Sequence, residues 1–260
     1  QINFKIGETT GLLPLFALNE AGYKNIIELS SLSYLENDEL SDPHVDFELL
    51  LSNSKGVAVF SGTVFGLFGK LFDKGKFSEI DELYNKIKNA FDDRFYLEIQ
   101  RHNDQNEIGF EKFNLKKSLD LEIPIIATNE VFYLDKEMHE AHDALICIGN
   151  KTYVNEKNRL KLTDQHYLKT NSEMSELFVD LPEALENNYN FPLRCSYRPL
   201  FSNPILPNIS SDKDGSADEI LKKDSIEGLK DKFNKIFNLS NDDLENNNSY
   251  KEYKLSLIHI

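Results

Sequence analysis

Phe95-Tyr96-Leu97-Glu98-Ile99-Gln100-Arg101-His102 is the stretch that decides the fold, an apolar run of strand length that ends in polar residues. A second such run, Ile123 to Thr128, follows a segment of helical length and continues into Asn129-Glu130-Val131-Phe132. Apolar strands that alternate with helices are typical of a parallel sheet covered by helices on both faces. In such sheets the functional side chains gather where the carboxyl end of a strand enters its loop. His102 and Glu130 therefore mark the place to look for chemistry.

The same alternation of strands and helices runs through most of the chain. Leu13 to Leu18 has the length of a strand, and Asn19 can cap a helix behind it. Gly56 to Gly62 encloses another apolar strand, and Ser78-Glu79-Ile80-Asp81 has the pattern of a capping box that opens a helix. A helix after the last strand can end at Gly149. The order of elements predicts an α/β fold, and an open sheet and a barrel both fit it.

The composition changes near residue 198. Three prolines lie between residues 199 and 207, and a stretch rich in Ser, Asp and Gly follows at 210–216, as in linkers. Ala217 to Phe237 has the apolar spacing of an amphipathic helix, and the Asn-rich run Asn238 to Tyr250 predicts a solvated loop. We therefore expect a domain boundary between residues 198 and 199.

Composition and charge exclude several classes of protein. A hydrophobic content of 40% can build a substantial core, which excludes a disordered chain. Lys and Arg number 29 against 44 Asp and Glu, and the net charge of -15 argues against a main nucleic-acid contact surface. Cys147 lies in an apolar run, where a buried reduced thiol is expected, and the cytoplasm is the natural compartment. No apolar stretch approaches the roughly 20 residues of a membrane helix.

Six blocks of sequence, taken together and in order, resemble the polymerase-and-histidinol-phosphatase (PHP) domain of bacterial replicative DNA polymerase III alpha subunits. They are Asn19 to Asn25, Phe60 to Gly62, Arg94 to His102, Ala127 to Glu130, Glu140 to Ile148 and Glu173 to Leu185. The resemblance covers about residues 12–254. It implies a distorted, TIM-like βα barrel of the PHP type for residues 1–198, without its first strands, whose histidine-rich motifs would lie upstream of Gln1. It also implies a linker and the start of the polymerase palm region over residues 199–254.

The resemblance also bears on metal binding. PHP enzymes hold two or three divalent metals, and in members that keep the site one strand ends in Gln-Arg-His and a later strand contributes an Asp-x-His pair. His102 matches the first histidine, Glu130 stands in place of the aspartate, and Phe132 replaces the second histidine. A phenyl ring has no lone pair to donate to a metal. We expect a vestigial metal site of His102 and Glu130 that holds neither zinc nor manganese. A hydrogen-bonded loop histidine is favoured over metal binding for His102, and a loop carboxylate is favoured in the same way for Glu130.

Other polar residues near these strand ends have structural explanations. His142 is expected to fix its helix against the barrel rim. His166 lies in a polar segment, and a position on the surface is expected. Arg101 is expected to pair with a carboxylate such as Glu98 or Glu130.

The functional expectation comes from the resemblance. It implies part of the catalytic subunit of a replicative DNA polymerase, which adds deoxynucleotides with Mg²⁺ at palm aspartates downstream of Ile260. No residue of this chain is therefore assigned as catalytic. The implied partners are the proofreading exonuclease subunit, the sliding clamp and other replisome subunits, with primer-template DNA bound by other regions and no membrane contact. The PHP domain itself is expected to be a scaffold and docking site. A metal-dependent phosphoesterase or 3'-5' exonuclease is the alternative, and a stand-alone PHP phosphatase is disfavoured by the polymerase-like continuation.

Leu255-Ser256-Leu257-Ile258-His259-Ile260 has an interpretation of its own. These six residues are what the transposase end sequence of tagmentation sequencing libraries encodes. We expect residues 255–260 to be translated adapter, and a short strand of alternating apolar residues is the alternative.

Overall fold

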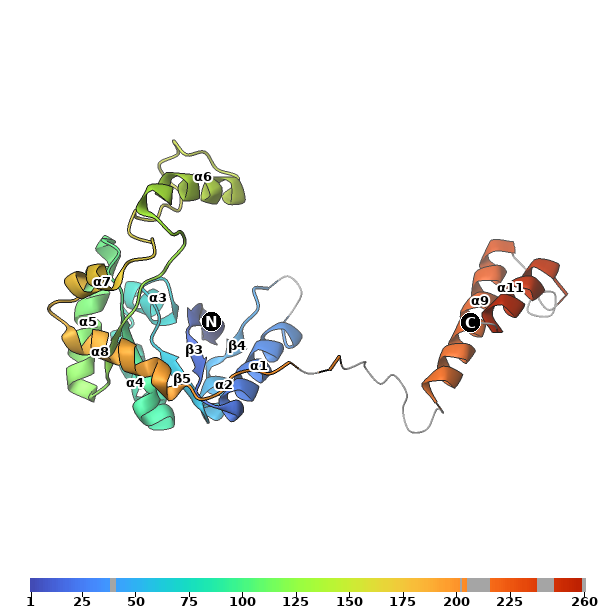
Figure 1. Ribbon diagram of the computed structural model, residues 1–260, viewed down its shortest axis with the longest axis horizontal. Coiled ribbons are helices and arrows are strands. Elements are labelled where there is room, and N and C mark those ends of the chain that lie inside the picture. Colours follow the sequence, from blue (N-terminus) through green and yellow to red (C-terminus); the bar gives the residue numbers. More distant parts are fainter. Residues whose placement is uncertain (38–40, 202, 205–215, 238–245, 259–260) are drawn as a thin grey trace. The chain divides into compact units, whose positions relative to one another are not determined.

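The structure is a computed structural model that describes residues 1–37, 41–201, 203–204, 216–237 and 246–258, with side chains up to Lys254. It divides into two compact units, Gln1–Pro199 and Leu200–Ile260, and each is described by itself. The strands and the candidate site belong to the first unit (Figure 1).

A four-stranded sheet forms the centre of the first unit. Its order is β3 (Leu15–Ala17), β5 (Val57–Phe60), β6 (Phe95–Ile99) and β7 (Ile125–Ala127). The last three strands are parallel, as their apolar sequences predict, and every residue in them is buried. β3 instead runs antiparallel to β5. Among the described residues the sheet does not close, so the structure shows a mixed α/β fold, and the expected barrel, which was predicted without its first strands, is not confirmed.

A second, three-stranded sheet uses the first residues of the chain. Its order is β2 (Thr9–Leu13), β1 (Ile2–Ile6) and β4 (Val45–Asp46), with β1 antiparallel to β2 and parallel to β4. The prediction of one strand over Leu13–Leu18 was wrong. Pro14 has no N–H to donate to a sheet, and the chain passes there from β2 in one sheet to β3 in the other.

Helices pack around these sheets. They are α1 (Glu20–Leu35), α2 (Phe47–Ser52), α3 (Leu67–Asp73), α4 (Phe77–Phe91) and α5 (Gln105–Leu121). The Asn19 cap is confirmed, because its side chain accepts a hydrogen bond from the Gly22 N–H at 3.1 Å. The capping box at Ser78 was wrong: α4 begins one residue earlier, so Ser78 already lies in its first turn.

Residues 131–167 form a lobe beyond the carboxyl end of β7, and its helix α6 (His139–Asn150) projects from the rest of the unit (Figure 1). The two arms of the lobe meet in a narrow neck, where Tyr133 and Tyr167 form a parallel β-bridge and Leu168 N–H donates to Tyr133 O at 3.0 Å. α6 does not end at Gly149. It continues to Asn150, and Lys151 adopts the left-handed conformation that closes the helix.

The chain returns from the lobe through α7 (Asn171–Leu177) and α8 (Pro182–Asn190). α8 packs beside β7, the edge strand of the central sheet. Its side-chain amides cover that edge: Asn187 donates to Ile125 O at 2.8 Å and Asn188 donates to Ala127 O at 2.6 Å. The two amides stand where a neighbouring strand would pair.

The second unit contains α9 (Ala217–Phe237), as predicted, and α11 (Asn248–Ile258). The solvated loop predicted to reach Tyr250 was wrong at its end, because Tyr250 is helical and buried against Phe233, with ring centroids 5.6 Å apart. Residues 238–245 lie outside the described part. So do the side chains of residues 255–260, and their interpretation as adapter stays a prediction.

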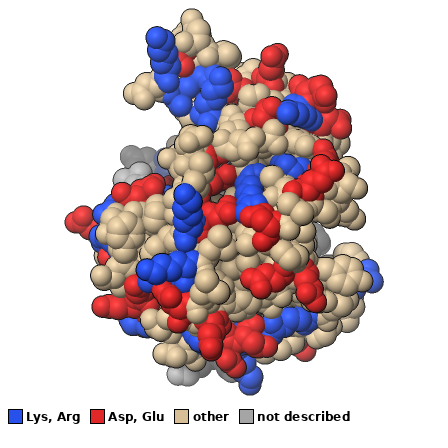
Figure 2. All heavy atoms as spheres, turned by 90° about the vertical axis from the view of Figure 1, so that its left-hand side faces the viewer, with Lys and Arg blue, Asp and Glu red and all other residues tan. Residues whose placement is uncertain are grey.

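Charge on the first unit is mixed. On the face shown in Figure 2, Asp and Glu side chains are interspersed with Lys and Arg. In the described residues no helix is long and apolar enough to cross a membrane.

Candidate functional site

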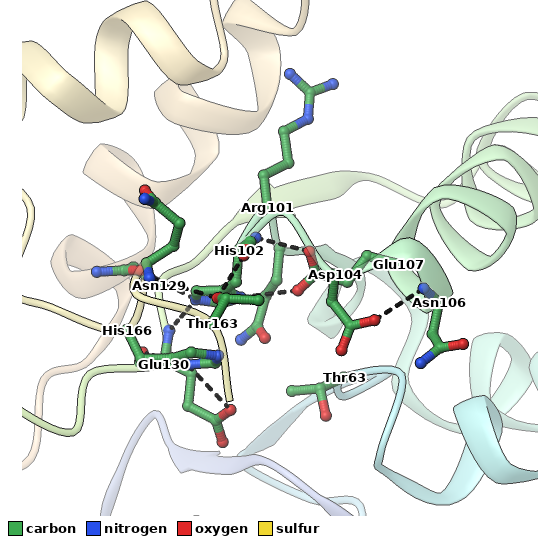
Figure 3. A network of polar contacts seen from close by, with 12 residues as sticks. Thr63, Arg101, His102, Asp104, Asn106, Glu107, Asn129, Glu130, Thr163 and His166 are labelled. Carbon is green, nitrogen blue, oxygen red and sulfur yellow. Dashed lines mark hydrogen bonds and ion pairs between the residues drawn. The ribbon is translucent and has the colours of Figure 1, made fainter. Parts of the chain in front are cut away.

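The parallel pairing of β6 and β7 brings the two predicted site residues together. Ile99 and Ala127 are register partners, and Thr128 N–H donates to Ile99 O at 3.1 Å. The loops that follow therefore leave the same edge of the sheet, and the Glu130 N–H lies 3.2 Å from His102 Nε2 (Figure 3). Sequence reasoning had placed His102 and Glu130 at matching strand ends, and the structure agrees.

His102 is buried, with 1% of its surface exposed, and both ring nitrogens have partners within the protein. Nδ1 lies 2.8 Å from a carboxylate oxygen of Glu107, whose other oxygen accepts the His102 N–H at 2.6 Å. Nε2 lies 3.2 Å from the Glu130 N–H and 3.1 Å from Asn129 Oδ1. It accepts from the first when unprotonated and donates to the second when protonated. In either state, a metal at His102 would have to displace one of these hydrogen bonds.

His166 covers the other face of this histidine. Its ring is stacked on the His102 ring, with centroids 4.1 Å apart and planes 3° from parallel. Nδ1 lies 3.2 Å from Glu130 O. Burial, together with the nearby His102, lowers the pKa of His166 to about 4. The expected surface position of His166 was wrong, because the chain returning from the lobe carries this residue onto the strand ends.

The Glu130 side chain extends past the His166 ring toward the turn at Gly62 and Thr63, and its carboxylate stays beside that ring (Figure 3). Its carboxylate is 32% exposed and lies 3.8 Å from His166 Nδ1. Partial burial raises the pKa of Glu130, and the charge of Glu107 adds to this effect. A cavity of about 70 Å³ lies beside it, with Leu12, Pro14, Gly62, Thr63 and Phe65 in its wall.

Phe132 packs against this cluster but offers no ligand atom: its ring centroid lies 5.3 Å from that of His166, and its N–H donates to His166 O at 2.9 Å. Its ring is 46% exposed and lies at the neck of the lobe, stacked on His142 with centroids 5.2 Å apart. His142 therefore packs α6 onto the neck of the lobe through Phe132 and Tyr133, and not onto a barrel rim as predicted. The described residues contain no group of three or more His, Cys, Asp or Glu side chains arranged to hold a metal ion. They do not fit the two- or three-metal cluster of a PHP enzyme.

Arg101 has different partners from those expected. Its guanidinium binds both oxygens of Glu111, at 2.6 and 3.1 Å, and both oxygens of Asp180, at 2.6 and 2.8 Å. It also donates to Leu177 O at 2.7 Å and lies over the Phe178 ring, 4.8 Å from its centroid. The predicted pairing with a carboxylate is confirmed, but the carboxylates are Glu111 and Asp180 and not the examples Glu98 and Glu130, so Arg101 ties the end of β6 to α5 and to the segment after α7.

Glu98 is a buried carboxyl whose role the sequence did not reveal. One oxygen accepts hydrogen bonds from Gln100 Nε2, at 3.1 Å, and from the Thr128 hydroxyl, while the other has no hydrogen-bond partner. Burial raises the pKa of Glu98, which favours its neutral form. The composition of β6 could have indicated this role, because Glu98 is the one charged residue in a strand that is buried on both faces.

The sequence of this chain is similar to known proteins over most of its length. Residues 3–102 match the sequence profile of the PHP domain. The chain is 36% identical over 218 residues to the DNA polymerase III subunit alpha of Caulobacter vibrioides, covering 84% of this chain and 19% of that protein. It is 33% identical over 264 residues to the Rickettsia bellii subunit, covering 99% of this chain and 22% of that protein.

The chain carries a PHP domain and is related to DNA polymerase III alpha subunits. The corresponding subunit of Borreliella burgdorferi is 34% identical over 234 residues, with 89% of this chain and 20% of that protein covered. The chain thus spans about a fifth of the length of these relatives. The profile match ends at His102, so Glu130, Phe132 and the lobe of the first unit lie beyond it.

Proposed function

We propose that this chain is part of the catalytic subunit of a replicative DNA polymerase and that its PHP domain is a scaffold with a degraded metal site. In this proposal the domain supports the polymerase core and docks the proofreading exonuclease subunit. DNA synthesis, with its Mg²⁺ ions, the sliding clamp and primer-template DNA, belongs to regions outside residues 1–260. The kinship with DNA polymerase III alpha subunits supports the polymerase assignment.

The observation that carries the scaffold proposal is the complete engagement of His102. Both of its ring nitrogens are hydrogen-bonded within the protein, and His166 lies flat on the ring. Hydrolysis of a phosphodiester by paired metals needs several open ligands that converge on one point. The Phe132 ring packs on both His142 and His166 and has no lone pair to offer beside Glu130.

Metal analysis of the full-length protein tests the scaffold. We expect less than one zinc or manganese per chain at this domain, and no removal of 3'-terminal nucleotides from single-stranded DNA by the domain. Glu130→Gln keeps the shape of the side chain and should change neither measurement, while His102→Ala could disturb the fold. A stoichiometric metal that disappears in both variants together with nuclease activity would support the alternative, a metal-dependent phosphoesterase or 3'-5' exonuclease.

The docking role needs its own experiment. The purified full-length protein is expected to retain the proofreading exonuclease subunit on size-exclusion chromatography, and deletion of residues 1–199 is expected to abolish retention while primer extension continues. Retention that survives this deletion would place the docking site elsewhere in the polypeptide.

A further inference from the structure

The most positive stretch of the chain is the loop that follows α6. Residues 151–161 carry three lysines and one arginine against one glutamate, a net charge of +3 in a chain whose net charge is -15. No other eleven consecutive residues of the sequence are as positive. On the face shown in Figure 2, several Lys and Arg side chains lie close together at the top, where the lobe projects. We call residues 151–161 the basic loop.

The lysines of the basic loop have no partner within the protein. Lys151, Lys157 and Lys161 are exposed, and in the part of the chain that the structure describes no ion pair or hydrogen bond engages their ammonium groups. Lys24 and Lys86 are also exposed, but each pairs with a carboxylate, at 2.8 and 2.7 Å. An unpaired ammonium group can donate charge-assisted hydrogen bonds to a phosphate. The basic loop therefore presents three such groups over a short length of chain.

The other charged residues of the loop hold its shape. Arg159 binds both oxygens of Asp143 on α6, at 2.6 and 2.7 Å, and donates to Val154 O at 3.0 Å. Glu156 accepts the Tyr153 N–H at 3.1 Å, and its own N–H donates to Tyr153 O at 3.0 Å. The loop is thus fastened to α6, and its one carboxylate is engaged in a turn of the loop itself.

Tyr153 adds an aromatic surface among these lysines. Its side chain is 75% exposed, and no other described ring packs against it. An open aromatic ring flanked by cations is typical of sites for single-stranded nucleic acid, because a base stacks on the ring while the cations bind the neighbouring phosphates. In a duplex the bases stack on one another, so their faces are not open to the ring. An acidic peptide would pair with the lysines but would leave the ring uncovered.

We propose that the basic loop binds single-stranded DNA, with Lys151, Lys157 and Lys161 on backbone phosphates and the Tyr153 ring stacked on a base. The acidic remainder of the chain confines this contact to the loop, since its charge repels phosphates. The inference goes beyond the scaffold role, and it rests on the proposed function only for the choice of DNA over RNA.

Three phosphate contacts make the interaction weak and dependent on salt. For a single strand the logarithm of the binding constant falls by about 0.7 for each phosphate contact per tenfold rise in salt, so three contacts give a slope of about −2. Between 50 and 200 mM salt the contact therefore weakens about 20-fold. The basic loop is an auxiliary contact, and the main DNA-binding surfaces lie in other regions of the polypeptide.

Photo-crosslinking in the full-length protein tests this contact, because it reports where on the protein a strand lies. The probe is an oligo(dT) strand that carries 5-iododeoxyuridine, and mass spectrometry locates the crosslinked peptide. We expect a crosslink at Tyr153 whose yield falls about 20-fold from 50 to 200 mM salt. Tyr153→Phe keeps a ring that can stack and should keep the crosslink, whereas Tyr153→Ala should abolish it.

Charge variants test the lysines. Lys151→Gln, Lys157→Gln and Lys161→Gln together should lower the crosslink yield at low salt at least about fivefold. The matched control removes the same charge from exposed lysines elsewhere in the first unit, through Lys55→Gln, Lys112→Gln and Lys116→Gln, and should keep the yield.

Absence of a crosslink within residues 151–161 would overturn the inference, as would an equal loss of yield in the control variant. Displacement of the strand from the loop by polyglutamate as efficiently as by unlabelled oligo(dT) would assign the loop to acidic polypeptides. An equal yield with duplex DNA would refute single-strand binding. None of these results changes the expected metal content or the retention of the exonuclease subunit, so this inference and the proposed function can fail separately.

Discussion

Acid is expected to destabilise the strand-end site through His166, and His166→Phe is expected to remove that sensitivity. The ring is buried on His102, which lowers the pKa of His166 from 6.5 to about 4. A histidine with a lowered pKa in the folded protein takes up a proton more readily when the protein unfolds. Protonation of His166 therefore has no effect on the free energy of unfolding above about pH 6.5. As the pH falls from about 6.5 toward 4, the unfolded chain binds the proton more tightly, and the free energy of unfolding decreases.

The magnitude follows from the two pKa values. At about pH 5 the unfolded imidazole is almost fully protonated and the folded one is mostly neutral, which lowers the free energy of unfolding by about 2 kcal/mol relative to pH 7.5. The loss approaches about 3 kcal/mol near pH 4. His166→Phe keeps a ring in the stack, gives up the contact with Glu130 O, and carries no titrating group. The loss of that contact costs the same at both pH values, so the free energy of unfolding of the variant should change little between pH 7.5 and 5 through this position.

Hydrogen exchange measured by mass spectrometry on the full-length protein provides the assay. Peptides that cover β6 and α5 report local unfolding once the pH dependence of intrinsic exchange has been divided out. The parent should lose about 2 kcal/mol of protection between pH 7.5 and 5, and His166→Phe should lose clearly less. His44→Phe, a substitution outside the stack, is the matched control. An unchanged pH dependence in His166→Phe would refute this account of the stacked pair.

Three further substitutions test individual contacts. Arg101→Lys keeps the charge but cannot hold two carboxylates and a carbonyl in one plane, and we expect it to lower the stability of the α5–β6 region by about 2 kcal/mol in the same exchange experiment. Gly22→Ala would place a Cβ atom 1.8 Å from Gly56 O, so the backbone must shift at a cost of about 1–3 kcal/mol. Gly149→Ala is its control, since no atom lies within 4 Å of the added carbon. Glu98→Gln should gain stability relative to the parent as the pH rises above 4.5, because burial raises the pKa of Glu98 and its ionisation costs stability in the folded state. A variant whose advantage shrinks toward neutral pH would contradict this.

Local sequence patterns predicted those parts of the fold that depend on near neighbours. In α4 the apolar residues recur at helical spacing, which is enough to predict one buried face, and all of them are buried: Ile80, Leu83, Tyr84, Ile87 and Phe91. The same holds for β5, β6 and β7, whose continuous apolar runs predicted strands covered on both faces. Pro14 broke the pattern, because run length alone does not reveal which sheet each half of Leu13–Leu18 joins.

The partners of the strand-end residues could not be predicted in this way. Arg101 binds Glu111, ten residues on, and Asp180, 79 residues on, and no periodic pattern links these positions. His166 lies 36 residues after Glu130 and reaches it only because the lobe folds back through its neck. Polar surroundings in the sequence favoured a surface position, but hydrogen bonds within the protein satisfy the polar groups after burial.

Segments that follow β7 cover two places where this domain could otherwise bind a strand or a metal. At the sheet edge, amides of α8 occupy the carbonyl groups that another strand would use. At the strand ends, His102 is hydrogen-bonded on both nitrogens and covered by His166. A metal or a strand would have to displace these hydrogen bonds, at a net cost of about 1 kcal/mol each and more where a buried group is left unpaired.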